Sequence, residues 1–129
     1  MPRTALVAES ASRIDPYIGV KDDPGAPFVA VDDVNGMSFV NNMNRSVLIV
    51  KNENAANSLV VTIPMPTTQK VAGIQVPDEV VTIPAEEEAY IGPFGAEWHQ
   101  DTSKTVHLNF SGTAPDGKIM QLNVAENNA

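Results

Sequence analysis

The sequence predicts an all-β fold: a single-domain antiparallel β-sandwich of jelly-roll type with an extended N-terminal arm. Short runs rich in Val, Ile, Leu and aromatic residues recur at a spacing of roughly ten residues. Clusters of Pro, Gly, Asn and Asp separate these runs, as turn formers do. No long window keeps the apolar spacing of a helix, and 10 prolines interrupt the chain. A small closed barrel needs the same alternation and stays the alternative architecture.

The predicted elements divide the 129 residues into an arm and a body within one domain. Residues 1–36 form the arm, because proline and glycine are frequent over 10–36 and leave room for one or two short edge strands. Residues 37–129 form the sandwich body. Its strands are predicted at 38–40, 46–51, 58–63, 70–76, 79–83, 88–92, 105–110 and 118–124.

The pentapeptide VVTIP occurs at 60–64 and again at 80–84. In each copy the second Val and the Ile point to one face, while the first Val and the Thr point to the other. The proline lacks a ladder N–H and marks the end of the strand. No third copy follows at the same spacing, so a solenoid is not indicated. The copies predict two core strands of the same in/out pattern, separated by the strand at 70–76.

A hairpin is predicted between the last two strands. Asp116-Gly117 lies between the β-type runs 105–110 and 118–124, and glycine accepts a positive φ at no steric cost.

Composition limits the classes of function. The net charge is −8, from 16 acidic and 8 basic residues, which disfavours phosphate contacts and predicts no nucleic-acid partner. The chain has no cysteine, which excludes disulfides and thiolate-bound metals. No apolar run is long enough for a signal peptide or a membrane span, so no membrane association is expected.

No catalytic motif is present, and we expect neither an enzyme nor a cofactor. The two histidines, His99 and His107, lack the close spacing of a metal pair, so a surface or structural role is favoured over metal binding. No serine lies in a G-x-S-x-G motif. The acidic run at 86–88 is interpreted as a solvated approach to a strand, because adjacent residues of a strand point to opposite faces.

An aromatic concentration at 90–98 is the strongest candidate for a binding site. Tyr90, Phe94 and Trp98 are three of only 7 aromatic residues in the chain. One interpretation, which we favour, is that Phe94 and Trp98 fold back and close one end of the sandwich. The other is that these rings anchor a partner chain or a sugar ring.

Four segments together resemble a family. They are MPRTALVA at the start, NRSVLIVKNENAANSLVVTIP in the middle, VVTIPAEEEAYIGPF after it, and VHLNFSG with KIMQLNV near the end. These resemble small head-associated proteins of tailed bacteriophages, which are virion components of the decoration or auxiliary capsid type. The resemblance spans most of the chain and is weakest over 10–36.

The resemblance implies a non-enzymatic structural protein that decorates or stabilises a phage capsid through protein–protein contacts. The implied partners are the major capsid protein or other virion proteins, and the implied assembly is a homo-oligomer, a dimer or trimer. The protein would be made in the host cytoplasm and located in the virion head. The candidate contact residues are Phe94, Trp98 and Tyr90 in the body with Pro24 and Phe28 in the arm, which would be able to add a strand to a neighbour.

Three alternatives stay open. A neck or tail component would share the same fold features. A carbohydrate-binding β-sandwich, adsorbing to host or mucosal glycans, would use Trp98, Tyr90 and Phe94 as its platform. A jelly-roll enzyme of the cupin type would require a metal bound by His99 or His107.

Overall fold

The computed structural model describes residues 3–11, 28–42 and 45–124, and over these the fold is all-β. Seven of the eight strands predicted for the body are present to within one residue at each end; the exception is 70–76. The strands are β1 (Thr4–Ala5), β2 (Ala8–Ala11), β3 (Val29–Ala30), β4 (Met37–Val40), β5 (Ser46–Asn52), β6 (Leu59–Ile63), β7 (Lys70–Val71), β8 (Ile74–Gln75), β9 (Glu79–Ile83), β10 (Glu88–Ile91), β11 (Thr105–Ser111) and β12 (Gly117–Val124), with a 3₁₀ turn, η1 (Ala96–Trp98).

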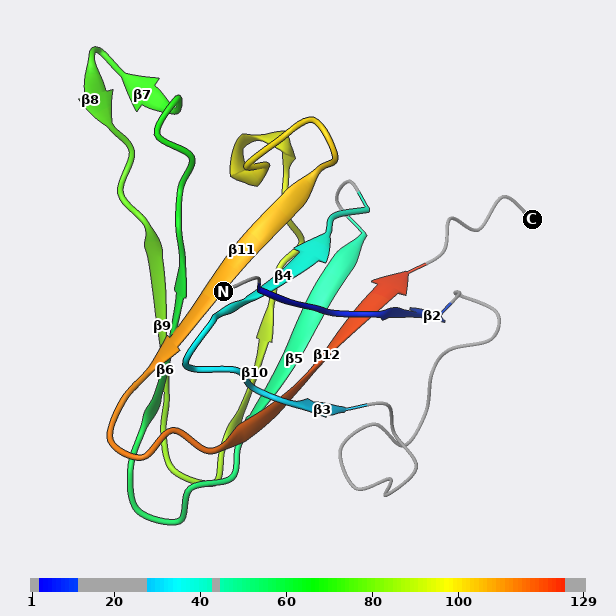
Figure 1. The fold of residues 1–129 in the computed structure, drawn as a ribbon, viewed down its shortest axis with the longest axis vertical. Helices are drawn as coiled ribbons and strands as arrows, with labels where there is room; N and C mark the ends of the chain where they lie inside the picture. Colours follow the sequence, from blue (N-terminus) through cyan, green and yellow to red (C-terminus); the bar gives the residue numbers. More distant parts are fainter. Residues whose placement is uncertain (1–2, 12–27, 43–44, 125–129) are drawn as a thin grey trace.

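Two sheets enclose one hydrophobic core, an arrangement consistent with a β-sandwich (Figure 1). The strand order is β1-β4-β11-β6-β9 in the first sheet and β10-β5-β12-β2 in the second, where β3 also pairs with β12. From β4 to β6 and again from β9 to β12, each successive strand lies in the other sheet, so the pairings join segments distant in sequence. Both sheets contribute to the core: Met37, Phe39, Leu59, Val61, Ile63, Ile83, Val106, Leu108 and Phe110 from the first, and Leu48, Val50, Ile91 and Ile119 from the second.

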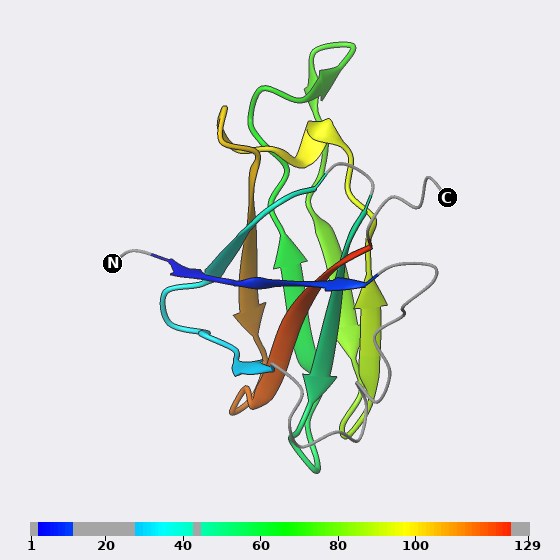
Figure 2. The same cartoon turned by 90° about the vertical axis from the view of Figure 1, so that its right-hand side faces the viewer.

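The N-terminal strands pair with both sheets. β1 runs parallel to β4, with Thr4 opposite Met37, and β2 runs parallel to β12, with Ala8 opposite Gln121. The chain therefore crosses from one sheet to the other within a few residues (Figure 2). Arg3 supports the start of this crossing, because its guanidinium donates to the Leu108 carbonyl oxygen at 2.9 Å. The described part of the predicted arm is thus hydrogen-bonded to the body, and a separate extended arm is not confirmed.

The two VVTIP copies are direct neighbours. They lie in β6 and β9, which pair antiparallel with Val61 opposite Val81. The predicted alternation is confirmed, since Val61 is buried and Val80 is exposed. Equivalent residues of the two copies differ in burial because β6 has a neighbouring strand on each side, whereas β9 is the last strand of the same sheet.

The expected strand at 70–76 is wrong. The chain there forms the short ribbon of β7 and β8, which projects beyond the sandwich at the end of the long β6–β9 hairpin (Figure 1). Ala72 and Gly73 reverse the chain with φ values of 53° and 80°. Two successive residues with positive φ suit a two-residue hairpin turn. From the sequence alone, the apolar residues around this turn are interpreted as one continuous strand.

The expected Asp116-Gly117 hairpin is also wrong, because β11 and β12 belong to different sheets. Gly117 instead opens β12 opposite Asn52 of β5. A Cβ at this position would lie only 2.6 Å from the Lys51 carbonyl oxygen. The glycine therefore serves close packing between β12 and β5 rather than a reversal of the chain.

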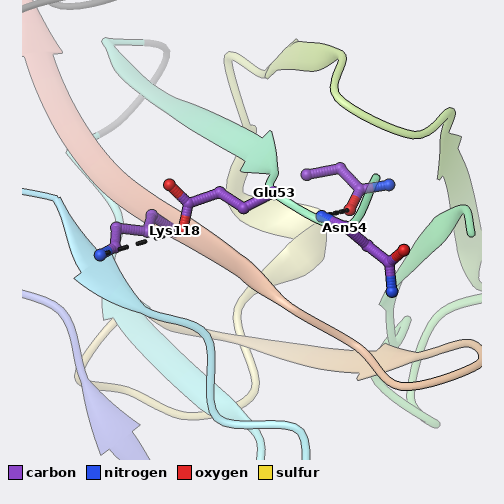
Figure 3. Close-up of polar contacts among 4 residues, drawn as sticks. Glu53, Asn54 and Lys118 are labelled. Atoms are coloured by element: carbon purple, nitrogen blue, oxygen red, sulfur yellow. Dashed lines mark hydrogen bonds and ion pairs between the residues drawn. The ribbon is translucent and has the colours of Figure 1, made fainter. Parts of the chain in front are cut away.

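A cluster of polar contacts links the C-terminal end of β5 to the following turn and to the end of β9. The buried Asn52 amide donates to the carbonyl oxygens of Asn57, Ile83 and Pro84 at 2.9, 3.0 and 3.1 Å, and its Oδ1 accepts from the Asn54 N–H at 3.0 Å. Figure 3 shows Asn54 within this cluster, together with the exposed Lys118–Glu53 ion pair. That pair, at 3.9 Å, contributes little because water screens it.

Candidate functional site

The aromatic residues predicted as a site converge at the end of β10. Phe94 is 3% exposed and packs against Phe39 of β4 with ring centroids 5.2 Å apart. Trp98 meets Phe94 edge-on, at 6.2 Å and 88°. Edge-to-face geometry suits the ring quadrupoles and adds to the energy of burial. The interpretation that Phe94 and Trp98 cover one end of the core agrees with these contacts.

The backbone that carries these rings is held by polar contacts. Gly92 has a φ of +125°, and a Cβ there would lie 2.7 Å from the Ser46 carbonyl oxygen, so only glycine fits. Beyond it, the buried Asn41 amide nitrogen donates to the Phe94 carbonyl oxygen at 3.0 Å and lies 2.9 Å from His99 Nε2. Since an amide nitrogen only donates, His99 Nε2 is the acceptor in this contact. Asn41, the residue that follows β4, thus contacts both ends of the Phe94–His99 segment.

A groove of about 310 Å³ opens beside this segment, and we call it the edge groove. Buried Ile63, Ile91 and Phe94 are among its lining residues. The remaining lining residues come from β9 and from the chain at and after β10: Glu79, Val81, Tyr90, Gly92, Pro93 and Trp98. The groove is therefore mostly apolar and aromatic, and it has one carboxylate.

The edge groove lies beside an outermost strand of each sheet. β9 is the last strand of one sheet and β10 the last strand of the other, so neither has a further strand partner among the described residues. An edge strand presents unpaired N–H and C=O groups to whatever approaches it. This end of the sandwich combines two free strand edges with an aromatic groove.

One acidic side chain lines the groove, and two more lie next to its aromatic lining residues. Glu79 lines it and is exposed, and Glu97 is exposed beside Trp98 in η1. On β10 the Tyr90 hydroxyl donates to Glu88 Oε1 at 3.3 Å. Partial burial, and secondarily the Glu88 charge, raise the pKa of Tyr90 above its ordinary value.

The other predicted contact residues do not join this groove. Phe28 lines a second groove of about 270 Å³ with Val29 and the β1 residues, at the opposite edge of the sandwich. Its ring lies under the Lys51 ammonium, 4.2 Å from the nitrogen to the ring centroid. Pro24 lies outside the described residues. Tyr90, Phe94 and Trp98 therefore line one groove, while Phe28 belongs to another part of the surface.

Sequence reasoning missed Glu79 and Val81 as parts of the site. They lie on β9, and the register of β9 against β6 brings them beside the aromatic segment. The alternation along the strand shows only that Glu79 shares a face with Val81 and Ile83. Nothing in the local sequence shows that this strand is an edge.

The two histidines have different surroundings. The His99 ring lies within hydrogen-bond distance of the Asn41 amide nitrogen, as described above. His107 lies on β11, on the polar face opposite Val106 and Leu108, as predicted. Within the described ranges, no group of three His, Cys, Asp or Glu side chains is arranged to hold a metal. Over the same ranges, no helix has the length and apolar character of a membrane span.

His107 predicts a loss of stability in acid. Burial first, then the positive charge of Arg3, lower the pKa of His107 below its ordinary value of 6.5, and Asp101 opposes this shift. A lowered pKa in the folded state means that protons bind the unfolded chain more tightly. This contribution to stability is full above pH 6.5 and declines as the pH falls through that value towards the lowered pKa. Urea unfolding at pH 7.5 and 5.5 should show a smaller decline in His107→Gln than in the unmodified protein; equal declines would contradict the assignment.

Comparisons with protein-family models, with curated proteins and with solved structures found no match.

Proposed function

We propose that this protein is a non-enzymatic structural component of a bacteriophage virion, which decorates or stabilises the capsid by binding another virion protein through the edge groove. The observation that carries this proposal is the meeting of two free strand edges over an aromatic groove. Aromatic side chains at the centre of a contact are frequent anchors in protein interfaces. The segments that resemble head-associated phage proteins include the stretch from Val80 to Phe94, which forms most of this groove.

The proposal extends to assembly and location. The major capsid protein is the expected partner, the protein is expected to bind in many copies as a dimer or trimer, and the phage head is the expected location. Jelly-roll connectivity and an N-terminal arm that reaches a neighbouring subunit belong to the same proposal.

Co-sedimentation with capsids that lack this protein tests the proposal. We expect saturable binding at a fixed ratio to the major capsid protein. Tyr90→Ala should weaken this binding by about tenfold, because it removes an exposed ring from the groove. Val34→Ala is the matched control, since Val34 is 82% exposed and lies outside the groove. Absence of saturable binding at every salt concentration would overturn the capsid role and direct attention to the neck or tail.

Carbohydrate binding is the second candidate, favoured by one feature of the groove. Tyr90 and Trp98 line it together with Glu79, whose carboxylate is able to accept hydrogen bonds from sugar hydroxyls. Trp98 is the only tryptophan, so its fluorescence reports on the groove alone. A saturable fluorescence change with glycans, lost in Tyr90→Ala, would favour this candidate over the capsid role.

A further inference from the structure

The free edge of β9 is suited to accept another strand. β9 pairs with β6 on one side, and on its other side no strand of the described chain covers it. Its Val80 and Thr82 are exposed on the outer face, while Val81 faces the groove. A strand added here would satisfy unpaired backbone groups of β9 and direct alternate side chains towards the groove.

The charged residues around this edge are acidic. Residues 71–103, which supply every groove residue except Ile63, contain seven Asp and Glu residues and no Lys or Arg. Glu79 is the charged member of the lining, on the inner face of β9. An inward-pointing charge on an edge strand disfavours pairing with an uncharged strand, because the carboxylate would lose its water without gaining a partner.

We propose that β9 and the edge groove take an extended, positively charged segment of the partner protein as an added strand, with a Lys or Arg of that segment facing Glu79. This inference rests on the proposed function and names the chemistry of its partner. Complementary charge steers the encounter and excludes wrong partners, while the aromatic groove accepts an apolar side chain of the same segment.

A second copy of this chain fits the edge less well. It carries the same net charge of −8, which opposes the approach of two copies, and its own β9 has no Lys or Arg to face Glu79. The charge of this surface thus favours a basic partner strand over self-association.

Synthetic peptides test the chemistry of the segment directly. The probe is a capped peptide of about seven residues, a length that runs along β9, in which the alternate positions on one face are Lys at both ends with Val between them, and the positions on the other face are Thr. We expect it to change Trp98 fluorescence saturably and to slow hydrogen exchange of β9 amides. A peptide with Glu in place of each Lys should not bind. Equal binding of both peptides would overturn the charge assignment.

N-methylated peptides test the added strand itself. One version carries N-methyl groups at odd positions and the other at even positions, so each blocks the backbone donors on one edge of the peptide. Strand addition requires that one version loses binding and the other keeps it, because only one edge of the peptide faces β9. Equal affinity of the two versions would overturn strand addition and leave a side-chain contact.

Two charge-reversal variants link the inference to capsid binding. Glu79→Lys should weaken binding of the basic peptide and of the capsid by about tenfold. Asp33→Lys is the control, because it makes the same charge change at an exposed turn outside the groove. Capsid binding that survives Glu79→Lys unchanged would overturn this inference while upholding the proposed function, whereas absence of capsid binding in the unmodified protein would overturn the function itself. A dimer whose β9 amides are protected at high concentration would assign the edge to a second copy instead.

Discussion

Replacing Phe94 with alanine is expected to lower the free energy of unfolding by about 4 kcal/mol. Phe94 is 3% exposed, belongs to the core cluster and contacts both Phe39 and Trp98. Truncation removes the buried ring and leaves a cavity between β4 and the Phe94–His99 segment, and partial collapse does not recover the lost contacts. Urea unfolding followed by far-UV circular dichroism measures this loss.

Tyr90→Ala is the matched control for Phe94→Ala. Both residues are aromatic and both line the edge groove, but Tyr90 is 61% exposed. Its truncation should change the free energy of unfolding by no more than about 0.5 kcal/mol. Similar losses in the two variants would contradict the division between a ring that supports the fold and a ring that is free for a partner.

Replacing Asn52 with alanine is expected to lower the free energy of unfolding by about 3 kcal/mol. The Asn52 amide donates to three carbonyl oxygens, and its Oδ1 accepts from the Asn54 N–H. Two of those carbonyls, on Ile83 and Pro84, close the end of β9. Without the amide, one buried carbonyl at the end of β9 and two part-buried carbonyls lose their partner, and that loss exceeds the worth of one ordinary hydrogen bond.

Asn57→Ala controls for the loss of an asparagine in the same turn. Asn57 contributes its backbone carbonyl to the cluster, which alanine retains. The variant should therefore unfold within about 0.5 kcal/mol of the unmodified protein. A loss in Asn52→Ala no larger than in Asn57→Ala would show that water replaces the Asn52 contacts at no cost.

Most strand positions were predictable because alternation has a period of two. In β6 and β11 the alternating residues that the pattern placed inside are buried, among them Val61 and Leu108. Where an apolar run contained its own reversal, at Ala72 and Gly73, the same pattern was misleading. The error at Asp116-Gly117 has a different cause, since glycine serves turns and close packing alike and the local sequence does not distinguish them.

The candidate site was predictable only in its local part. Tyr90, Phe94 and Trp98 are close in sequence and meet at one groove, so composition alone was enough to identify them. Glu79 joins them through the register of β9 on β6, a contact with no local signature. Phe28 was grouped with them by its hypothetical role in an arm, but it lies at the opposite edge of the sandwich.

By itself the sequence determined the class of fold, the in/out alternation of most body strands, an acidic surface and one aromatic segment. These depend on local residue types and on spacing within a few residues. Tertiary structure decided which strands are neighbours, that β9 and β10 both end their sheets beside the aromatic segment, and that Phe94 is buried while Tyr90 is exposed. The physical reason is that a free edge is a property of pairings between distant strands, and identical pentapeptides in β6 and β9 acquire different surroundings from their neighbours alone.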